Sequence, residues 1–125
     1  PFERPIQGAE LPDEHPLAAT ARCIHIARVA QEAYPKLPML AFGYGWLRHL
    51  LPNVAAAVIA GGGAAMIGQG RGAFAYPDSP RDVLATGRMA ENKCCITCSL
   101  CTQYMRDGRN TGCAVRDSAI YGRKA

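Results

Sequence analysis

The sequence lacks an apolar run long enough to cross a membrane as a helix. Such a helix needs about 20 consecutive apolar residues, and the best candidate, residues 54–67, is broken by Gly61, Gly62 and Gly63. A secretory signal pattern is also missing. The 14 Lys and Arg residues are scattered and form no dense run interleaved with aromatic residues. These absences argue against membrane and nucleic-acid partners and favour a cytoplasmic location.

Regular periodicity is absent from the first dozen residues, which contain three prolines and no initiating methionine. We therefore expect the sequence to be an internal part of a longer protein. With 125 residues and 49% apolar composition, it has room for one ordinary folded domain or part of one. Disorder is not expected from that balance.

Helix and strand patterns alternate along the first 90 residues. The spacing predicts helices over residues 13–34 and 46–60, the first with Asp13 as its N-cap and the second with a restart at Pro52. Short apolar runs predict a strand at 39–42, covered on both faces, and another at 64–68. A third helix is expected from an N-cap at Ser79 to Gly87. This order is typical of a parallel α/β sheet.

Cysteines cluster strongly, because five of the six lie within residues 94–113 and only Cys23 stands apart. A disulfide framework would require an oxidising compartment, which the rest of the sequence does not suggest. The spacing C-x2-C-x2-C-x11-C instead suits a 4Fe–4S cluster, with three thiolates on one tight turn and a fourth returning from a distant loop. The predicted ligands are Cys95, Cys98, Cys101 and Cys113.

Two other metal sites compete with this interpretation. Zinc sites more often pair two separated C-x2-C knuckles, and the second knuckle is missing here. The alternative set Cys94, Cys98 and Cys101 has the C-x3-C-x2-C spacing of radical S-adenosylmethionine enzymes, but only 24 residues follow Cys101, too few for the barrel that such a motif precedes. We therefore expect Cys94 and Cys23 to be packing residues.

Both predicted strands end in glycine-rich turns, Gly43-Tyr44-Gly45 and Gly68-Gln69-Gly70-Arg71. In an eightfold barrel, loops at the carboxyl ends of the late strands commonly bind a cofactor phosphate through backbone amides, and an arginine adds charge. Glycines that serve only as strand-to-helix turns remain an alternative.

Together these segments resemble a known family. The run MIGQGRGAFAYPD is similar to the last barrel strand of the old yellow enzyme family, and PMLAFGYGWLR resembles the strand before it. The cysteine segment resembles the iron–sulfur branch of that family, which includes 2,4-dienoyl-CoA reductase and trimethylamine dehydrogenase. The resemblance covers residues 13–121, and the matches occur in the family's order.

The resemblance implies that residues 1–90 are the C-terminal portion of a TIM (β/α)8 barrel with an FMN phosphate site, and that residues 91–125 form a 4Fe–4S segment and tail. It assigns FMN contacts to Gly43, Tyr44, Gly70 and Arg71, and cluster ligands to Cys95, Cys98, Cys101 and Cys113. The implied activity is that of an NAD(P)H:flavin oxidoreductase acting on an activated alkene or related small substrate.

The family's substrate-binding and proton-donating residues belong to earlier barrel strands, so no catalytic residue is predicted here and the chain alone is expected to be inactive. His15, His25 and His49 match no catalytic position. The remainder of the barrel is an implied partner, and association into homo-oligomers stays open. The alternative function is a small iron–sulfur or zinc binding module without enzymatic activity.

Overall fold

The computed structural model describes Glu10 and residues 13–122. The rest of the predicted irregular start and the end of the basic tail lie outside the described residues. Within them, no helix combines the length and the apolar character needed to cross a membrane. In chain order the elements are α1 (Pro16–Ala33), β1 (Leu40–Ala41), the 3-10 helix η1 (Gly45–Leu50), α2 (Leu51–Ala60), β2 (Met66–Ile67), α3 (Gly72–Ala75), α4 (Ser79–Thr86), the 3-10 helix η2 (Glu91–Lys93), α5 (Leu100–Arg106) and α6 (Ser118–Tyr121).

Helix α1 starts later than predicted, because its N-cap is His15 and not Asp13. His15 Nδ1 accepts a hydrogen bond from the Leu17 N–H at 3.2 Å, and the ring packs edge-on against Trp46. Pro16 occupies the first turn, where its missing N–H has no helical partner to lose. A histidine that sequence analysis left without a role therefore fixes the start of the helix.

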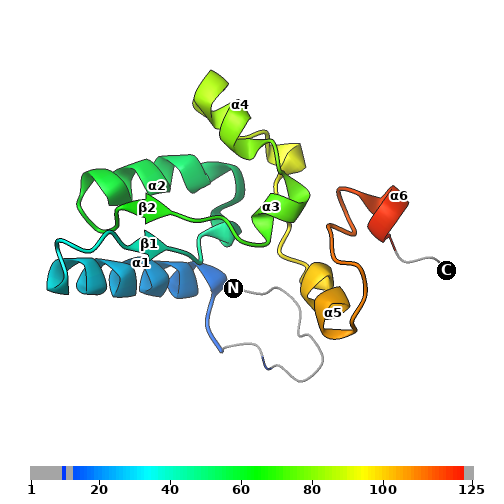
Figure 1. Ribbon diagram of the computed structural model, residues 1–125, viewed down its shortest axis with the longest axis horizontal. Helices are drawn as coiled ribbons and strands as arrows, with labels where there is room; N and C mark the ends of the chain where they lie inside the picture. Colours follow the sequence, from blue (N-terminus) through cyan, green and yellow to red (C-terminus); the bar gives the residue numbers. More distant parts are fainter. Residues whose placement is uncertain (1–9, 11–12, 123–125) are drawn as a thin grey trace.

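Strands β1 and β2 pair in parallel, as predicted, with Leu40 opposite Met66 and Ala41 opposite Ile67. Both are shorter than the predicted runs. Helix α2 connects them, so the segment is a β-α-β crossover unit (Figure 1). One such parallel unit is compatible with two strand–helix units of an eightfold barrel, and that larger fold stays a prediction.

One face of this small sheet is covered and the other is open. On the covered face, Ala41 and Ile67 pack with residues of both α1 and α2, among them Ile24, Ala27 and Val58. The open face carries apolar side chains that are about half exposed: Leu40 (47%), Phe42 (52%) and Met66 (52%). The prediction of a strand covered on both faces is therefore wrong for the described residues, although the apolar pattern behind it is present.

The segment after β1 changes helix type at the expected place. Gly45–Leu50 is a 3-10 helix, and the α-helix restarts at Leu51 with Pro52 in its first turn. Arg48, with φ 53°, kinks the 3-10 segment internally, before this restart. Proline favours this arrangement because it cannot donate the hydrogen bond that a continuous helix would need at that position.

Helix α4 begins differently from the prediction. Asp78 is its N-cap residue, and Ser79 is the first helical residue, whose hydroxyl donates to Gln69 Oε1 at 2.9 Å. The predicted end is confirmed, since Gly87 adopts a left-handed conformation with φ 72°.

The cysteine-rich segment lies beside α3, at the end of the molecule away from the α1–β1 connection (Figure 1). The Arg116 guanidinium donates two hydrogen bonds to the Cys94 carbonyl, from Nε at 3.2 Å and from Nη2 at 2.9 Å. This clamp joins positions 22 residues apart and closes the C-terminal loop onto the start of the segment.

Candidate cofactor site

A cavity of about 240 Å³ opens where β1 and β2 end; we call it the strand-end cavity. Because the strands are parallel, their carboxyl ends lie at the same edge, and the two glycine-rich turns meet there. All four predicted phosphate-contacting residues line it: Gly43, Tyr44, Gly70 and Arg71. The structure therefore brings together two turns that are 27 positions apart in sequence.

Backbone amides around this cavity suit an anion. In the part of the chain that the structure describes, the N–H groups of Gly43, Tyr44, Gly70 and Gly72 donate to no acceptor. The guanidinium of Arg71 supplies positive charge in the same cavity. Free amides with one arginine are the usual donor set for a phosphate, so these residues fit the phosphate of a flavin mononucleotide.

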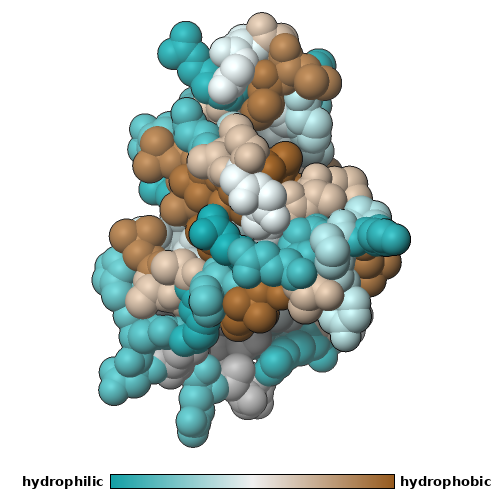
Figure 2. Space-filling view, turned by 90° about the vertical axis from the view of Figure 1, so that its left-hand side faces the viewer, coloured by the Kyte–Doolittle hydropathy of each residue, from teal (hydrophilic) through white to brown (hydrophobic). Residues whose placement is uncertain are grey.

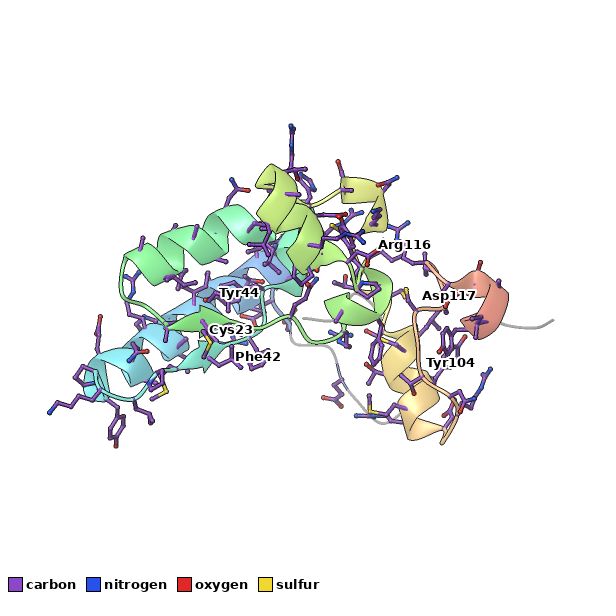
Figure 3. The ribbon with its side chains drawn as sticks, turned by 45° about the horizontal axis from the view of Figure 1, so that its top comes forward. Cys23, Phe42, Tyr44, Tyr104, Arg116 and Asp117 are labelled. Atoms are coloured by element: carbon purple, nitrogen blue, oxygen red, sulfur yellow. The ribbon has the colours of Figure 1, made fainter. Side chains whose placement is uncertain are left out.

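The turn after β1 is held from behind by α1. Gly43 has φ 99°, and a Cβ atom built on it would lie 2.7 Å from Cys23 Sγ. Tyr44 is only 1% exposed and packs in the core with Ala41 and Val58. Burial raises the pKa of the Tyr44 phenol. Tyr44 therefore presents its backbone, and not its hydroxyl, to the strand-end cavity; Figure 3 shows it beside Cys23 and Phe42.

A second, smaller cavity is lined by all four predicted cluster cysteines; we call it the cysteine cavity. Cys98 and Cys101 flank the start of α5, whereas Cys113 returns from the loop before α6. In the structure, all six cysteines of the chain are free thiols. Cys94 is separate from this cavity: it is 1% exposed, and its Sγ donates to the Ala90 carbonyl at 3.3 Å.

The loop between the cysteines has an unusual backbone. Thr97 (φ 57°) and Ser99 (φ 64°) are both left-handed, a conformation that costs non-glycine residues about 1–3 kcal/mol. Both are almost fully buried, at 3% and 2% exposure. Left-handed residues help to turn neighbouring amides toward one concave side, an arrangement found at many iron–sulfur sites.

Two backbone amides already donate to cysteine sulfurs. The Thr97 N–H lies 3.3 Å from Cys95 Sγ, and the Arg116 N–H lies 3.3 Å from Cys113 Sγ. Such N–H···S bonds stabilise thiolates and set the potential of a bound cluster. Burial raises the pKa of the Cys95 thiol, and the Thr97 N–H and then Arg71 oppose that rise. The donor set therefore fits a thiolate-bound cluster.

Across the described residues, no group of three or more His, Cys, Asp or Glu side chains is gathered closely enough to hold a metal ion. A single zinc ion would bring its thiolates to about 3.8 Å from one another, given a Zn–S distance of about 2.3 Å. A cubane attaches each thiolate to a different iron atom and spreads them more widely. The finding applies equally to the four predicted cluster cysteines, so their binding of a 4Fe–4S cluster stays a prediction.

Arg71 and Cys95 line both cavities. The Arg71 Nη1 donates to Ser99 Oγ at 3.2 Å, which ties the phosphate turn to the cysteine loop. Arg116 lines the far side of the cysteine cavity, and Figure 3 shows it between η2 and α6. The two candidate cofactor sites are therefore neighbours that share a wall.

A larger hollow, of about 570 Å³, lies elsewhere, between α2 and α4. Its lining is almost entirely apolar and includes no charged side chain, histidine or cysteine. The chemistry-bearing residues are therefore gathered in the two smaller cavities.

Searches against protein-family models, curated proteins and solved structures gave no match for this chain. The case for its function consequently rests on the geometry of the two cavities.

Sequence analysis missed three residues of this site: Thr97, Ser99 and Arg116. The first two stand between cysteines in the motif C-x-T-C-S-x-C, a signal that small polar residues line the loop, but their left-handed backbone cannot be read from the sequence. Gly112, next to Cys113, leaves room for the Tyr121 ring, with which a Cβ there would collide. Lys93 pairs with Asp82, and Arg109 stacks over Tyr104, so neither lines the cysteine cavity.

Proposed function

We propose that this chain is the cofactor-holding C-terminal part of an FMN- and 4Fe–4S-dependent NAD(P)H:flavin oxidoreductase of the ene-reductase type. The observation that carries the proposal is the shared wall. A cavity built from two strand-end glycine turns and a cavity lined by four cysteines have Arg71 and Cys95 in common. Two redox groups bound there would be close enough to exchange electrons.

The strand-end cavity takes the phosphate end of FMN. Its volume of about 240 Å³ is below the roughly 300–1,000 Å³ of a complete ligand pocket, so the isoalloxazine ring would extend past it along the open face of the sheet. The amides of Gly43, Tyr44 and Gly70 orient the phosphate, and Arg71 neutralises it. The remaining strands of the barrel would cover the ring.

The cysteine cavity takes the cluster, with Cys95, Cys98, Cys101 and Cys113 as its ligands. When bound, FMN supplies hydride transfer to an activated alkene or related small substrate, and the cluster supplies one-electron transfer. The Thr97 and Arg116 amides hold charge on two of the sulfurs. NAD(P)H is the proposed electron donor, and the reducing cytoplasm, where thiols stay free, is the proposed location.

The test is cofactor analysis of the intact protein purified without oxygen. We expect about four iron and four inorganic sulfide per chain, together with one flavin released on denaturation that chromatographs as FMN. Riboflavin or FAD in its place would contradict the phosphate assignment. Iron and sulfide without any flavin would instead favour a binding module with no enzymatic role, and a single zinc per chain would contradict both assignments.

A further inference from the structure

The contact between Arg71 and Ser99 joins the two cavities directly. Ser99 is 2% exposed and belongs to the cysteine loop, one residue after Cys98 and two before Cys101. Its hydroxyl accepts from Arg71 Nη1 at 3.2 Å and donates to the Thr97 carbonyl at 3.3 Å. Thr97 in turn donates its N–H to Cys95 Sγ. The guanidinium is therefore connected to a predicted cluster sulfur through the hydrogen bonds of Ser99 and the backbone of Thr97.

We propose that Ser99 is a positioning residue that links phosphate binding to cluster binding. The inference rests on the proposed function and adds to it a dependence of one site on the other. A bound cluster fixes the loop that carries Ser99, and Ser99 then holds the guanidinium of Arg71 against the strand-end cavity. Without the cluster, the left-handed loop loses the groups that hold it in shape, and Arg71 loses one of its anchors.

Such linkage is reciprocal: if the cluster strengthens phosphate binding, a bound phosphate stabilises the cluster by the same factor. Loss of a hydrogen bond that involves a charged group weakens binding by about tenfold or more. The effect concerns only the phosphate. Riboflavin, which has the same ring and ribityl chain but no phosphate, should not respond.

The experiment compares FMN and riboflavin binding to the intact protein, stripped of flavin, with its cluster present or removed by an iron chelator. Dissociation constants come from the quenching of flavin fluorescence. For the unaltered protein, removing the cluster should weaken FMN binding about tenfold and change riboflavin binding less than twofold. Equal FMN affinity with and without the cluster would overturn this inference while leaving the proposed function intact.

Ser99→Gly is the sharpest variant, because glycine removes the hydroxyl and adopts the left-handed backbone without strain. The variant should keep the absorption spectrum of the cluster and should bind FMN about tenfold more weakly even with the cluster present. Removing its cluster should then change its FMN affinity by less than twofold. Ser118→Ala, at an exposed serine of α6, is the matched control and should behave as the unaltered protein.

Two outcomes for the variants would overturn the inference. One is a Ser99→Gly protein that keeps the full cluster-dependent change in FMN affinity. The other is loss of the cluster itself, since we assign Ser99 to Arg71 and not to iron. If the intact protein binds a cluster and no FMN at all, the proposed function fails together with the inference.

Discussion

Cys94 and Cys95 are adjacent in sequence and have opposite environments. The Cys94 side chain packs in the core with Tyr76 and Met89, and its carbonyl is held by Arg116. The Cys95 side chain lines both cavities. Because successive side chains of an extended segment point to opposite sides, one of the pair is directed inward and the other toward the candidate cluster.

We therefore predict that Cys113→Ala abolishes the 4Fe–4S absorbance and the bound iron of the intact protein, whereas Cys94→Ala keeps both. Alanine at position 113 removes the only ligand from the distant loop, while alanine at position 94 removes a packing group. Iron and sulfide analysis of the two purified variants is the measurement. The opposite pattern would support the radical-enzyme spacing of Cys94, Cys98 and Cys101.

Gly43 and Gly70 line the same cavity and differ sharply in what a side chain would meet. At Gly43 the backbone is left-handed and a Cβ would press on Cys23, whereas at Gly70 no atom lies within 4 Å. We expect Gly43→Ala to lower the free energy of unfolding by about 2 kcal/mol or more, and Gly70→Ala to change it by less than about 0.5 kcal/mol. Denaturant unfolding measures both.

A double variant separates the two causes at Gly43. Adding Cys23→Ala to Gly43→Ala removes the sulfur that the new methyl group would meet but leaves the unfavourable φ in place. Part of the lost stability should therefore return, and a fully additive loss would contradict the steric contact.

At the residue scale, prolines, glycines and cysteine spacing were the informative signals. Pro16, Pro52 and Gly87 each restrict the backbone in a way that does not depend on the rest of the fold, and the structure confirms their positions at helix ends. The N-cap at His15 was not predictable in the same way. Asp13 is the better capping residue by intrinsic preference. His15 also packs against Trp46, a residue distant in sequence, and a local sequence pattern does not reveal that contact.

At the scale of elements, one side-chain network ties α3, α4 and η2 together. The buried Tyr76, next to the end of α3, donates its hydroxyl to Asp82 Oδ2 at 2.5 Å, and Lys93 Nζ lies 3.1 Å from the same oxygen. The Ala90 N–H donates to the Tyr76 hydroxyl at 3.3 Å. Asp82 of α4 therefore holds these three segments together.

This network makes stability depend on pH. The hydrogen bond from Tyr76, followed by that from Lys93, favours the ionised carboxylate and holds the pKa of Asp82 below its usual value. Because an unfolded Asp titrates at about 3.9, the stabilisation is complete above that pH and is lost as pH falls through the lower folded pKa. The same contact with Asp82 raises the pKa of Lys93, so its contribution is complete below about 10.4 and is lost as pH rises through the folded value.

Asp82→Asn should therefore lower the melting temperature at pH 7, with the difference from the unaltered protein shrinking as pH falls below about 3.9. Thermal unfolding followed by circular dichroism between pH 2 and 7 provides the comparison. Asp78→Asn, which removes an exposed ion pair with Arg81 one turn away, serves as control and should have little effect at any pH. A constant difference across the whole pH range would show that Asp82 acts by packing alone.

At the scale of the whole molecule, the sequence order of elements predicted the parallel β-α-β unit, because alternation of helix and strand leaves few other topologies. The adjacency of the two cavities was only implied by the family resemblance. It arises from contacts between residues 28 positions apart, such as Arg71 with Ser99, that no local pattern encodes. Figure 2 shows the opposite end of this unit, at the α1–β1 and α2–β2 connections, where hydrophobic surface lies between hydrophilic side chains.

The open face of the sheet leads to a prediction about the longer protein. Parallel sheets are covered on both faces in nearly all known folds, and in an eightfold barrel the face with Leu40, Phe42 and Met66 would point into the barrel interior. A charge at Met66 would then be buried without a partner.

We expect Met66→Asp to lower the free energy of unfolding of the intact protein by about 3 kcal/mol or more. Leu84→Asp, at a residue that is 89% exposed on α4, should change it by less than about 0.5 kcal/mol. Equal, small effects of both substitutions in denaturant unfolding would mean that this face stays open to solvent, and that no barrel closes over it.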